Sequence, residues 1–377
     1  MNFKELLQRL RQKAKFEPKF IGVLALVAVG AFVIISLILG AIMHSVEKSR
    51  YEIQPLDERI VYDAAPHDVK NDFSLLLEKQ PSVLNGAPIE QDIGKGQALA
   101  VIIENYTPIR STQVGLEDAA IVYEVPTEGG ITRLLAIYDG QPVEVMGPVR
   151  SARPYFITWA SEYRAALVHV GGSPDSLANL RGNFRLFNID EFADYVTIWR
   201  NNQYLAPHNA FTSTENIYKR LNKEEYYQPV KTKRFPFKNP DSESGDIRTI
   251  TIDFSIAPYA VKYDYDEATH TYTRSNGGKP HHNIKPANVV VQFVDTQVLD
   301  DIGRLRIQTH GTGNAVVFRD GHVIEGTWEK DASINSPDQP MDQSWTKFFD
   351  KNGNEITLNR GQVWIEVVPN ERPVNYF

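Results

Sequence analysis

An uncharged run near the N-terminus constrains this chain more than any other feature. The run extends over 24 residues, from Phe20 to Met43, and consists mainly of Val, Leu, Ile, Ala and Phe. Roughly 20 apolar helical residues span the hydrocarbon core of a bilayer. Backbone amides inside lipid must pair within their own segment. The sequence therefore predicts a transmembrane helix over residues 20–43.

The charges that flank this run predict its orientation. Basic residues precede it at Lys4, Arg9, Arg11, Lys13, Lys15 and Lys19, and follow it at Lys48 and Arg50. Basic residues collect on the cytoplasmic side, so residues 1–19 are expected to be a cytoplasmic tail and the bulk of the chain extracytoplasmic. A cleaved signal peptide is the alternative. Its apolar region would be about 7–15 residues long and would end at an A-x-A-like site. The run here is longer and no good site of this kind follows it, which favours an uncleaved, single-pass anchor in the cell membrane.

Composition excludes several classes of protein. The chain has no cysteine, which excludes disulfides, thiolate metal sites, a cysteine nucleophile and lipid attachment through cysteine. The first fifty residues carry 8 Lys and Arg and 3 Asp and Glu, which leaves 32 and 44 for the remainder, a net charge of −12. That charge argues against nucleic-acid binding. The sequence also lacks a P-loop and a dinucleotide G-x-G-x-x-G after a strand, so no nucleotide partner is expected.

The chain beyond the anchor divides into a linker and two domains. Prolines punctuate a polar stretch over residues 44–83, which is expected to be a stalk. Near-continuous apolar runs then predict strands buried on both faces at 98–104, 119–125, 131–138 and 165–170, with helical patterns at 154–163 and 174–180. Strands that alternate with helices predict an α/β (α+β) domain with a mixed sheet over residues 84–235.

A second domain is expected after a basic and then Pro-, Ser- and Asp-rich segment at 231–245. Short strands and tight turns predict a mostly antiparallel β domain over residues 246–377. The expected strands are 247–254, 260–264, 288–295, 304–309, 315–319, 322–328 and 363–368. Asp320-Gly321 predicts a two-residue hairpin, because both residues tolerate the positive φ of a type I′ turn.

Three polar clusters of the first domain are candidate sites. In the first, Glu124, Glu128 and Arg133 lie around a Gly-Gly connection between two strands. Paired carboxylates can act as acid and base when their surroundings separate their pKa values. A Glu–Arg salt bridge across the loop is the alternative, and it is favoured because structural ion pairs also bring ionisable groups together.

The second cluster contains Arg150, Ser151 and Arg153, directly before Pro154. Proline is common at the first position of a helix, and arginines beside a helix N-terminus suit an anion. Alternatively, Arg150 and Arg153 pair with Glu124 and Glu128. Both interpretations hold if the ion-pair network is also the site.

The third cluster is His169, Gly171, Gly172 and Ser173, between an expected buried strand and a helix. Ser173 suits an N-cap with Pro174 at the first helical position. A serine nucleophile near His169 is the alternative, but the G-x-S-x-G elbow is missing. The other histidines, His208, His281, His282 and His310, show no metal-binding spacing, so neither a metal nor a cofactor is expected.

Taken in order, these clusters resemble the YerB-like family, a bacterial domain of unknown function (number 3048). The matching stretches are 119–133, 149–156, 168–174, 313–321, 326–328 and 358–364, and the resemblance covers roughly residues 84–370 in two domains. It implies an exported, membrane-attached bacterial protein, because members are often classed as lipoproteins. This chain departs from them in having no cysteine. The family has no settled activity that could be transferred.

These observations favour an extracytoplasmic protein that binds an anionic or polar ligand or partner of the cell envelope, such as the cell wall or another envelope protein. The residues expected to bind it are Arg133, Arg150, Ser151, Arg153, Gly171, Gly172 and Ser173. The alternative is an enzyme acting on envelope glycan or peptide, with Glu124 or Glu128 as acid or base and His169 as auxiliary. A structural interaction protein is the third possibility.

Overall fold

A computed structural model of the chain describes residues 81–89, 92–182, 186–230, 234–331 and 345–377. All of them belong to one compact unit, Ser74–Phe377. The expected cytoplasmic tail, the transmembrane helix over 20–43 and the stalk, except for its last three residues, lie outside the described residues. Among the described residues, no helix has the length and apolar character needed to cross a bilayer.

The first half of the chain forms part of a mixed sheet, as predicted. Its strands are β1 (Leu99–Glu104), β2 (Ile121–Pro126), β3 (Thr132–Tyr138), β4 (Ala166–His169) and β5 (Asn188–Asp190). β1 is antiparallel to β3 and parallel to β4. Every residue of β1 is buried, so its continuous apolar sequence reflects cover on both faces of the sheet.

Three helices accompany these strands. They are α3 (Pro154–Glu162), α4 (Pro174–Gly182) and α5 (Thr214–Lys223). Pro154 and Pro174 begin their helices, as predicted, because proline fixes a helical φ where the backbone N–H would have no intrahelical partner. The sequence reasoning did not predict α5. Its N-cap Ser213 accepts a hydrogen bond from Asn216 N at 3.1 Å.

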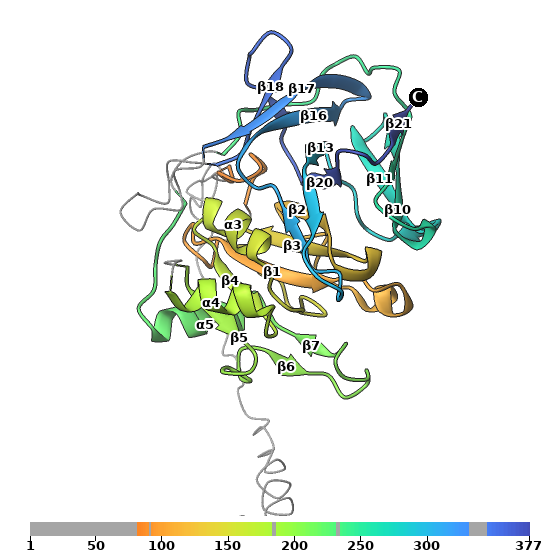
Figure 1. Cartoon of the computed structure of the whole chain (residues 1–377). Coiled ribbons are helices and arrows are strands. Elements are labelled where there is room, and N and C mark those ends of the chain that lie inside the picture. The colour runs from red at the N-terminus through yellow and green to blue at the C-terminus, as the bar shows by residue number, and fades with distance from the viewer. Residues whose placement is uncertain (1–80, 90–91, 183–185, 231–233, 332–344) are drawn as a thin grey trace, which may run out of the picture. The chain divides into compact units, whose positions relative to one another are not determined.

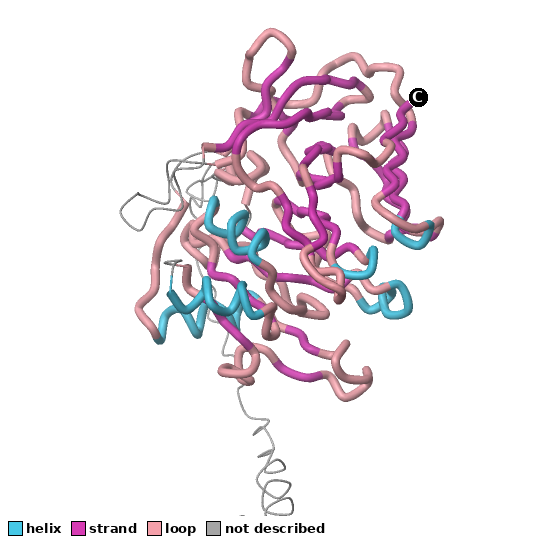
Figure 2. The backbone as a smooth tube through the Cα atoms, in the orientation of Figure 1, coloured by secondary structure: helices cyan, strands magenta, loops and turns pink. Residues whose placement is uncertain are grey.

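The second half is built almost entirely from strands (Figure 2). Five of them belong to the same sheet as β1–β5: β13 (Asn288–Val294), β16 (Gly311–Arg319), β17 (His322–Lys330), β18 (Lys347–Asp350) and β20 (Val363–Pro369). A smaller sheet contains β9 (Thr249–Asp253), β10 (Ala260–Asp266), β11 (Thr271–Asn276), β12 (Lys279–His281) and β21 (Val374–Tyr376). Asp320 and Gly321 join β16 to β17 with φ of 53° and 70°, as a type I′ turn requires.

Short elements complete the described part of the chain. The paired strands are β6 (Trp199–Arg200) with β7 (Ala210–Phe211), β8 (Phe237–Lys238) with β19 (Leu358–Asn359), and β14 (Thr296–Val298) with β15 (Leu305–Ile307). The 3₁₀ turns are η2 (Thr107–Thr112), η3 (Glu128–Gly130) and η4 (Ala257–Tyr259).

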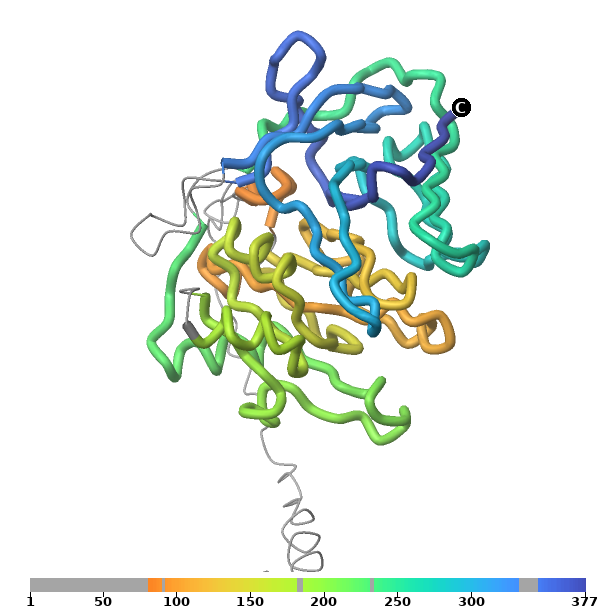
Figure 3. The backbone as a smooth tube through the Cα atoms, viewed as in Figure 1, coloured from red at the N-terminus to blue at the C-terminus, as the bar shows by residue number. Residues whose placement is uncertain are grey.

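The expected boundary at 231–245 does not separate two sheets. β20 lies parallel to β2, with Ile121 opposite Val363 and Glu124 opposite Glu366. Within the described residues, the order of the main sheet is β18-β17-β16-β13-β20-β2-β3-β1-β4-β5. Residues 84–235 and 246–377 therefore contribute strands to one sheet, and Figure 3 shows segments from the two halves running beside one another. Without β20, the outer edge of β2 would expose unpaired backbone N–H and C=O groups.

Different elements cover the two faces of the main sheet (Figure 1). On one face, α3 contributes Phe156 and Trp159 to the core cluster that also holds Phe348 and Leu358. On the other face, a second core cluster holds Val101 of β1 together with Ile217 of α5 and Ile250 of the small sheet. Strands β10 and β11 of the small sheet lie against β2 and β20, where Tyr263 contacts Glu366 and Arg274 contacts Glu124.

Candidate functional site

The structure brings the three predicted polar clusters together. Ala152 N donates a hydrogen bond to Gly171 O at 2.9 Å, and Ser173 N donates one to Ala152 O at 3.2 Å. Arg133, on β3, donates from Nη1 to Ser151 O at 2.9 Å. The loop before α3 thus lies between the loop before α4 and the beginning of β3.

Arg153 pairs with Glu128, which is one of the two pairs expected from the sequence. Its Nη2 donates to Glu128 Oε2 at 2.9 Å, and its Nε to Oε1. Burial by itself would raise the pKa of Glu128, but the hydrogen bond and charge of Arg153 lower it. Glu128 and Arg153 therefore neutralise one another.

The expected pair between Arg150 and Glu124 is wrong. Arg150 Nε lies 3.2 Å from Oε1 of Glu104, the last residue of β1. Glu124 lies in the middle of the sheet beside β20, fully buried, and is bound by Arg274 of β11. The second half of the chain supplies this partner, and sequence proximity gave no sign of it.

His169 and Ser173 are held by their surroundings rather than by each other. His169 is fully buried, its Nδ1 lies 2.8 Å from Gly171 O, and burial lowers its pKa. Ser173 Oγ accepts a hydrogen bond from Ser176 N at 3.3 Å. Ser173 thus caps α4 as predicted. The preceding residue packs closely against the loop before α3, because a Cβ on Gly172 would come within 3.1 Å of Ala152 O.

Two of the predicted arginines line a small pocket of about 250 Å³, here called the arginine pocket. Its lining residues are Glu104, Asn105, Tyr106, Ile131, Thr132, Arg133, Arg150 and His208. Arg133 is only 9% exposed, and burial together with the charge of Arg153 lowers its pKa to about 10. Among the described residues, Arg133 has no carboxylate within salt-bridge distance. Arg133 therefore does not form the salt bridge expected across the Gly-Gly connection, and Glu128 acts on its charge only from a greater distance.

A histidine–glutamate pair forms one wall of the arginine pocket. His208 Nδ1 lies 2.8 Å from Glu104 Oε2, and the His208 ring stacks on Tyr106 with 5.5 Å between centroids. Glu104 contacts both His208 and Arg150, which fixes their orientation. The sequence gave no signal for this pair, because the two residues are 104 positions apart.

A buried charge network lies where the small sheet meets the main sheet. Glu124 Oε1 accepts from Thr132 Oγ1 at 2.5 Å and from Asn105 Nδ2 at 3.1 Å, while Oε2 accepts from Arg274. Arg274 is also buried, and its guanidinium lies 4.4 Å from the centroid of the Trp364 ring. Both carboxylate oxygens of Glu124 accept from protein groups, in a position closed to solvent.

Glu366 is the second carboxylate of this network. It is fully buried on β20, opposite Glu124, and its Oε1 accepts from Tyr263 Oη. Burial and the neighbouring charge of Glu124 raise the pKa of Glu366 to about 8. One of the two carboxyls therefore keeps its proton at neutral pH, as expected for like charges that share a site.

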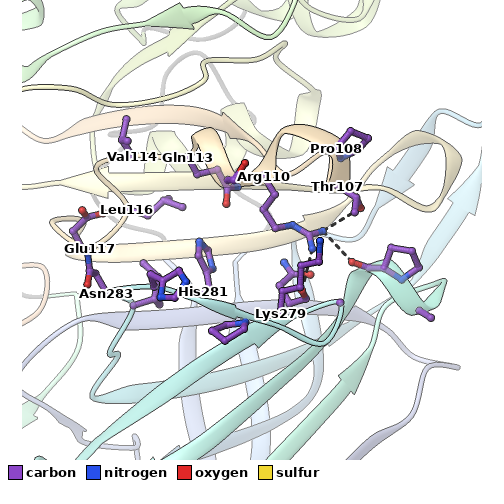
Figure 4. Close-up of a pocket in the computed structure, with 18 residues that line it drawn as sticks. Thr107, Pro108, Arg110, Gln113, Val114, Leu116, Glu117, Lys279, His281 and Asn283 are labelled. Atoms are coloured by element: carbon purple, nitrogen blue, oxygen red, sulfur yellow. Dashed lines mark hydrogen bonds between the residues drawn. The ribbon is translucent and has the colours of Figure 1, made fainter. Parts of the chain in front are cut away.

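A larger cavity of about 800 Å³, here called the junction cavity, lies between the two halves of the chain (Figure 4). One wall comes from η2 and the residues after it, and the other from η4 and the β11–β12 hairpin. His281, at its inner side, has its pKa lowered to about 2 by burial and by Arg274. No group of three or more His, Cys, Asp or Glu side chains suited to a metal occurs in the described part of the chain.

Comparison with known proteins identifies the family. Residues 84–227 match the model described as "Protein of unknown function (DUF3048) N-terminal domain", and residues 250–365 match the corresponding C-terminal domain. The chain belongs to the DUF3048 family. This confirms the family predicted from the sequence. The arginine pocket lies within the N-terminal DUF3048 segment, whereas the junction cavity is lined by both segments.

A relative and a solved structure cover most of the chain. The chain is 29% identical over 319 residues to "Putative lipoprotein YerB" of Bacillus subtilis (strain 168), covering 81% of this chain and 89% of that protein. It is also similar to the crystal structure of the YerB protein from Bacillus subtilis, with a TM-score of 0.66 and 27% identity, over 79% of this chain and 100% of that one.

Proposed function

We propose that this protein is a membrane-anchored, extracytoplasmic binding protein that captures an anionic group of a cell-envelope ligand in the arginine pocket. The observation that carries the proposal is Arg133, a nearly buried cation that binds a carbonyl oxygen and, in the described part of the chain, has no carboxylate within salt-bridge distance. Arginine binds carboxylate and phosphate groups through two parallel hydrogen bonds. An anion in the pocket would supply the missing countercharge.

The geometry of Arg150 supports the same chemistry. Its Nε is buried without a hydrogen-bond partner among the described residues, although Glu104 lies 3.2 Å away. The pocket measures about 250 Å³, which suits one acidic group rather than a whole ligand, since pockets for larger molecules span about 300–1,000 Å³. The rest of the ligand would lie outside the pocket.

Binding of inorganic phosphate and of acetate to the full-length protein in detergent tests this proposal. Wild type is expected to bind one of the two anions, with affinity that falls as salt concentration rises. Arg133→Met should abolish binding, whereas Arg181→Met, an exposed arginine on α4, should not. Equal binding by wild type and Arg133→Met, or no binding by wild type, would contradict the proposal.

The extracytoplasmic location rests on the apolar run over 20–43, on its flanking charges and on the similarity to a protein named a lipoprotein. Because the chain has no cysteine, single introduced cysteines report topology without background. An impermeant thiol reagent applied to intact cells should label Asn352→Cys and should not label Gln8→Cys. The reverse pattern would refute the orientation.

A second candidate function is hydrolysis of an envelope glycan or peptide, favoured by the pair of His208 and Glu104. A histidine oriented by a carboxylate is the usual form of a general base, and His208 lines the same pocket as the two arginines. Incubation of the full-length protein with isolated cell-wall material separates the two functions. Released fragments that disappear with His208→Ala support the enzyme, and retention of the material without release supports the binding protein.

A further inference from the structure

Two cations of the junction cavity form no salt bridge within the described residues, although the charge of Glu124 acts on one of them, Arg110. The guanidinium of Arg110 is held by neutral acceptors: Nε donates to Asn105 Oδ1 at 2.8 Å, and Nη2 to Pro258 O at 3.0 Å. No carboxylate lies within salt-bridge distance of Arg110 in the described residues, and burial lowers its pKa. Lys279 is exposed, and its Nζ likewise makes no hydrogen bond or ion pair with them.

The opposite end of the cavity has a different charge. Figure 4 shows Arg110 and Lys279 toward one end of the cavity and Glu117 with Asn283 toward the other. Register confirms the first group, because Lys279 is the cross-strand partner of Asn276, whose carbonyl accepts from Arg110 Nη1 at 3.2 Å. The cavity therefore suits a ligand with an anionic group at one end and a cationic or neutral donor group at the other.

Amide groups also line the cavity. Gln113 Oε1 and Asn276 Oδ1 are buried and have no hydrogen-bond donor in the described part of the chain. The Asn276 side chain cannot turn to water instead, because the residue is only 1% exposed. Buried acceptors without a partner are destabilising and rare in folded proteins. His281 adds a donor: Arg274 Nη1 lies 2.6 Å from its Nδ1, so the ring proton is on Nε2, for which the described residues provide no partner.

We propose that the junction cavity binds a short peptide segment through its carboxylate and its backbone amides. The carboxylate lies at Arg110 and Lys279, and the amides pair with Gln113, Asn276 and His281. The remaining wall is apolar at Pro108, Val114, Leu116 and Ile284, which accommodates aliphatic side chains. Among the described residues that line the cavity, none is Phe, Tyr or Trp, and sugar rings bind mainly on such aromatic faces.

This site is separate from the arginine pocket. In the described residues, no side chain lines both cavities, and the segment 104–106 divides them. The hairpin that presents Asn276 and Lys279 packs closely against η4 at its turn, because Gly277 has φ of 59° and a Cβ there would lie 2.6 Å from Pro258 O.

Affinity selection with the full-length protein in detergent tests the proposal. The probes are a random pentapeptide library with free C-terminal carboxylates, the same library with amidated C-termini, and a set of neutral oligosaccharides. Wild type should retain free-acid peptides and neither of the other two sets. For the best retained peptide, Lys279→Ala should weaken binding about tenfold, as expected for loss of one charge-assisted contact.

Two further variants locate the site. Ser111→Trp, at the exposed edge of the cavity, should abolish peptide binding, and Lys285→Ala, an exposed lysine outside the cavity, should leave it unchanged. Retention of oligosaccharides in place of peptides, or no retention at all, would overturn the proposal. Binding that survives Lys279→Ala and Ser111→Trp but is lost in Arg133→Met would assign the peptide to the arginine pocket instead.

Discussion

Replacement of Arg274 by methionine is predicted to destabilise the protein strongly. The arginine donates a hydrogen bond to Glu124, and its Nε donates one to Tyr263 Oη at 3.1 Å. Its guanidinium also covers the face of the Trp364 ring. Methionine keeps most of the apolar volume of the side chain. The principal loss is therefore the countercharge of Glu124, which remains fully buried.

The magnitude follows from the number of charges left unpaired. Glu366 holds its proton at neutral pH, since its pKa is about 8, so Arg274→Met leaves one uncompensated carboxylate rather than two. Removal of one partner from a buried ion pair destabilises a protein by about 3–5 kcal/mol. For a folded unit of this size, that corresponds to a fall in melting temperature of roughly 10 °C.

Thermal melts of the full-length protein in detergent, followed by tryptophan fluorescence, measure the effect. Arg248→Met is the matched control, because its ion pair with Glu267 is 48% and 65% exposed and should contribute less than about 0.5 kcal/mol. Adding Glu124→Gln to Arg274→Met should recover much of the loss, since it removes the unpaired charge. A melt of Arg274→Met within about 2 °C of the control would refute the reasoning.

Three other predictions follow from the described contacts. Arg150→Ala should lower the free energy of unfolding by only about 1–3 kcal/mol, because Glu104 keeps His208 as a partner. Denaturant titration measures this loss, and a larger value would show that His208 does not compensate. Ser173→Ala should destabilise by about 1 kcal/mol through loss of the α4 cap, with Ser151→Ala, whose backbone carbonyl makes the described contact, as a near-neutral control. Between pH 6.5 and about 8, the folded state retains a proton on Glu366 that the unfolded state, with a pKa near 4.5, has released. Stability should therefore fall as pH rises through this window, by up to about 1.4 kcal/mol per pH unit, and Glu366→Gln should remove that slope from the pH profile.

Local sequence signals predicted the elements of the first half well. Strands such as β1 are apolar at every position but the last because both of their faces are covered, and α3 and α4 begin at prolines. The capping role of Ser173 was also predicted, since it depends on a preference that short segments carry. The pair of Glu128 with Arg153, 25 positions apart, was one of the alternatives that the sequence left open.

Long-range pairing could not be predicted in the same way. Arg274 binds Glu124 across 150 positions, and nothing in the surroundings of Arg274 in the sequence marks it as buried. The adjacent histidines His281 and His282 have the character of a solvated loop, yet His281 is directed toward Arg274. The parallel pairing of β20 with β2 has no local signature either, because the sequence of β20 does not distinguish it from the other apolar strands as the partner of β2.

The position of β20 has a consequence for how the chain is made. A ribosome releases residues 363–369 after every other described strand of the main sheet, yet they lie between β2 and β13 in the middle of that sheet. Until they emerge, the outer edge of β2 has no strand beside it and the later strands have no connection to the earlier ones. The two DUF3048 segments, although separate in sequence, thus complete their shared sheet only after residues 363–369 have emerged. A chain that stopped at residue 227 would expose an unpaired apolar strand edge, the kind of surface through which proteins aggregate.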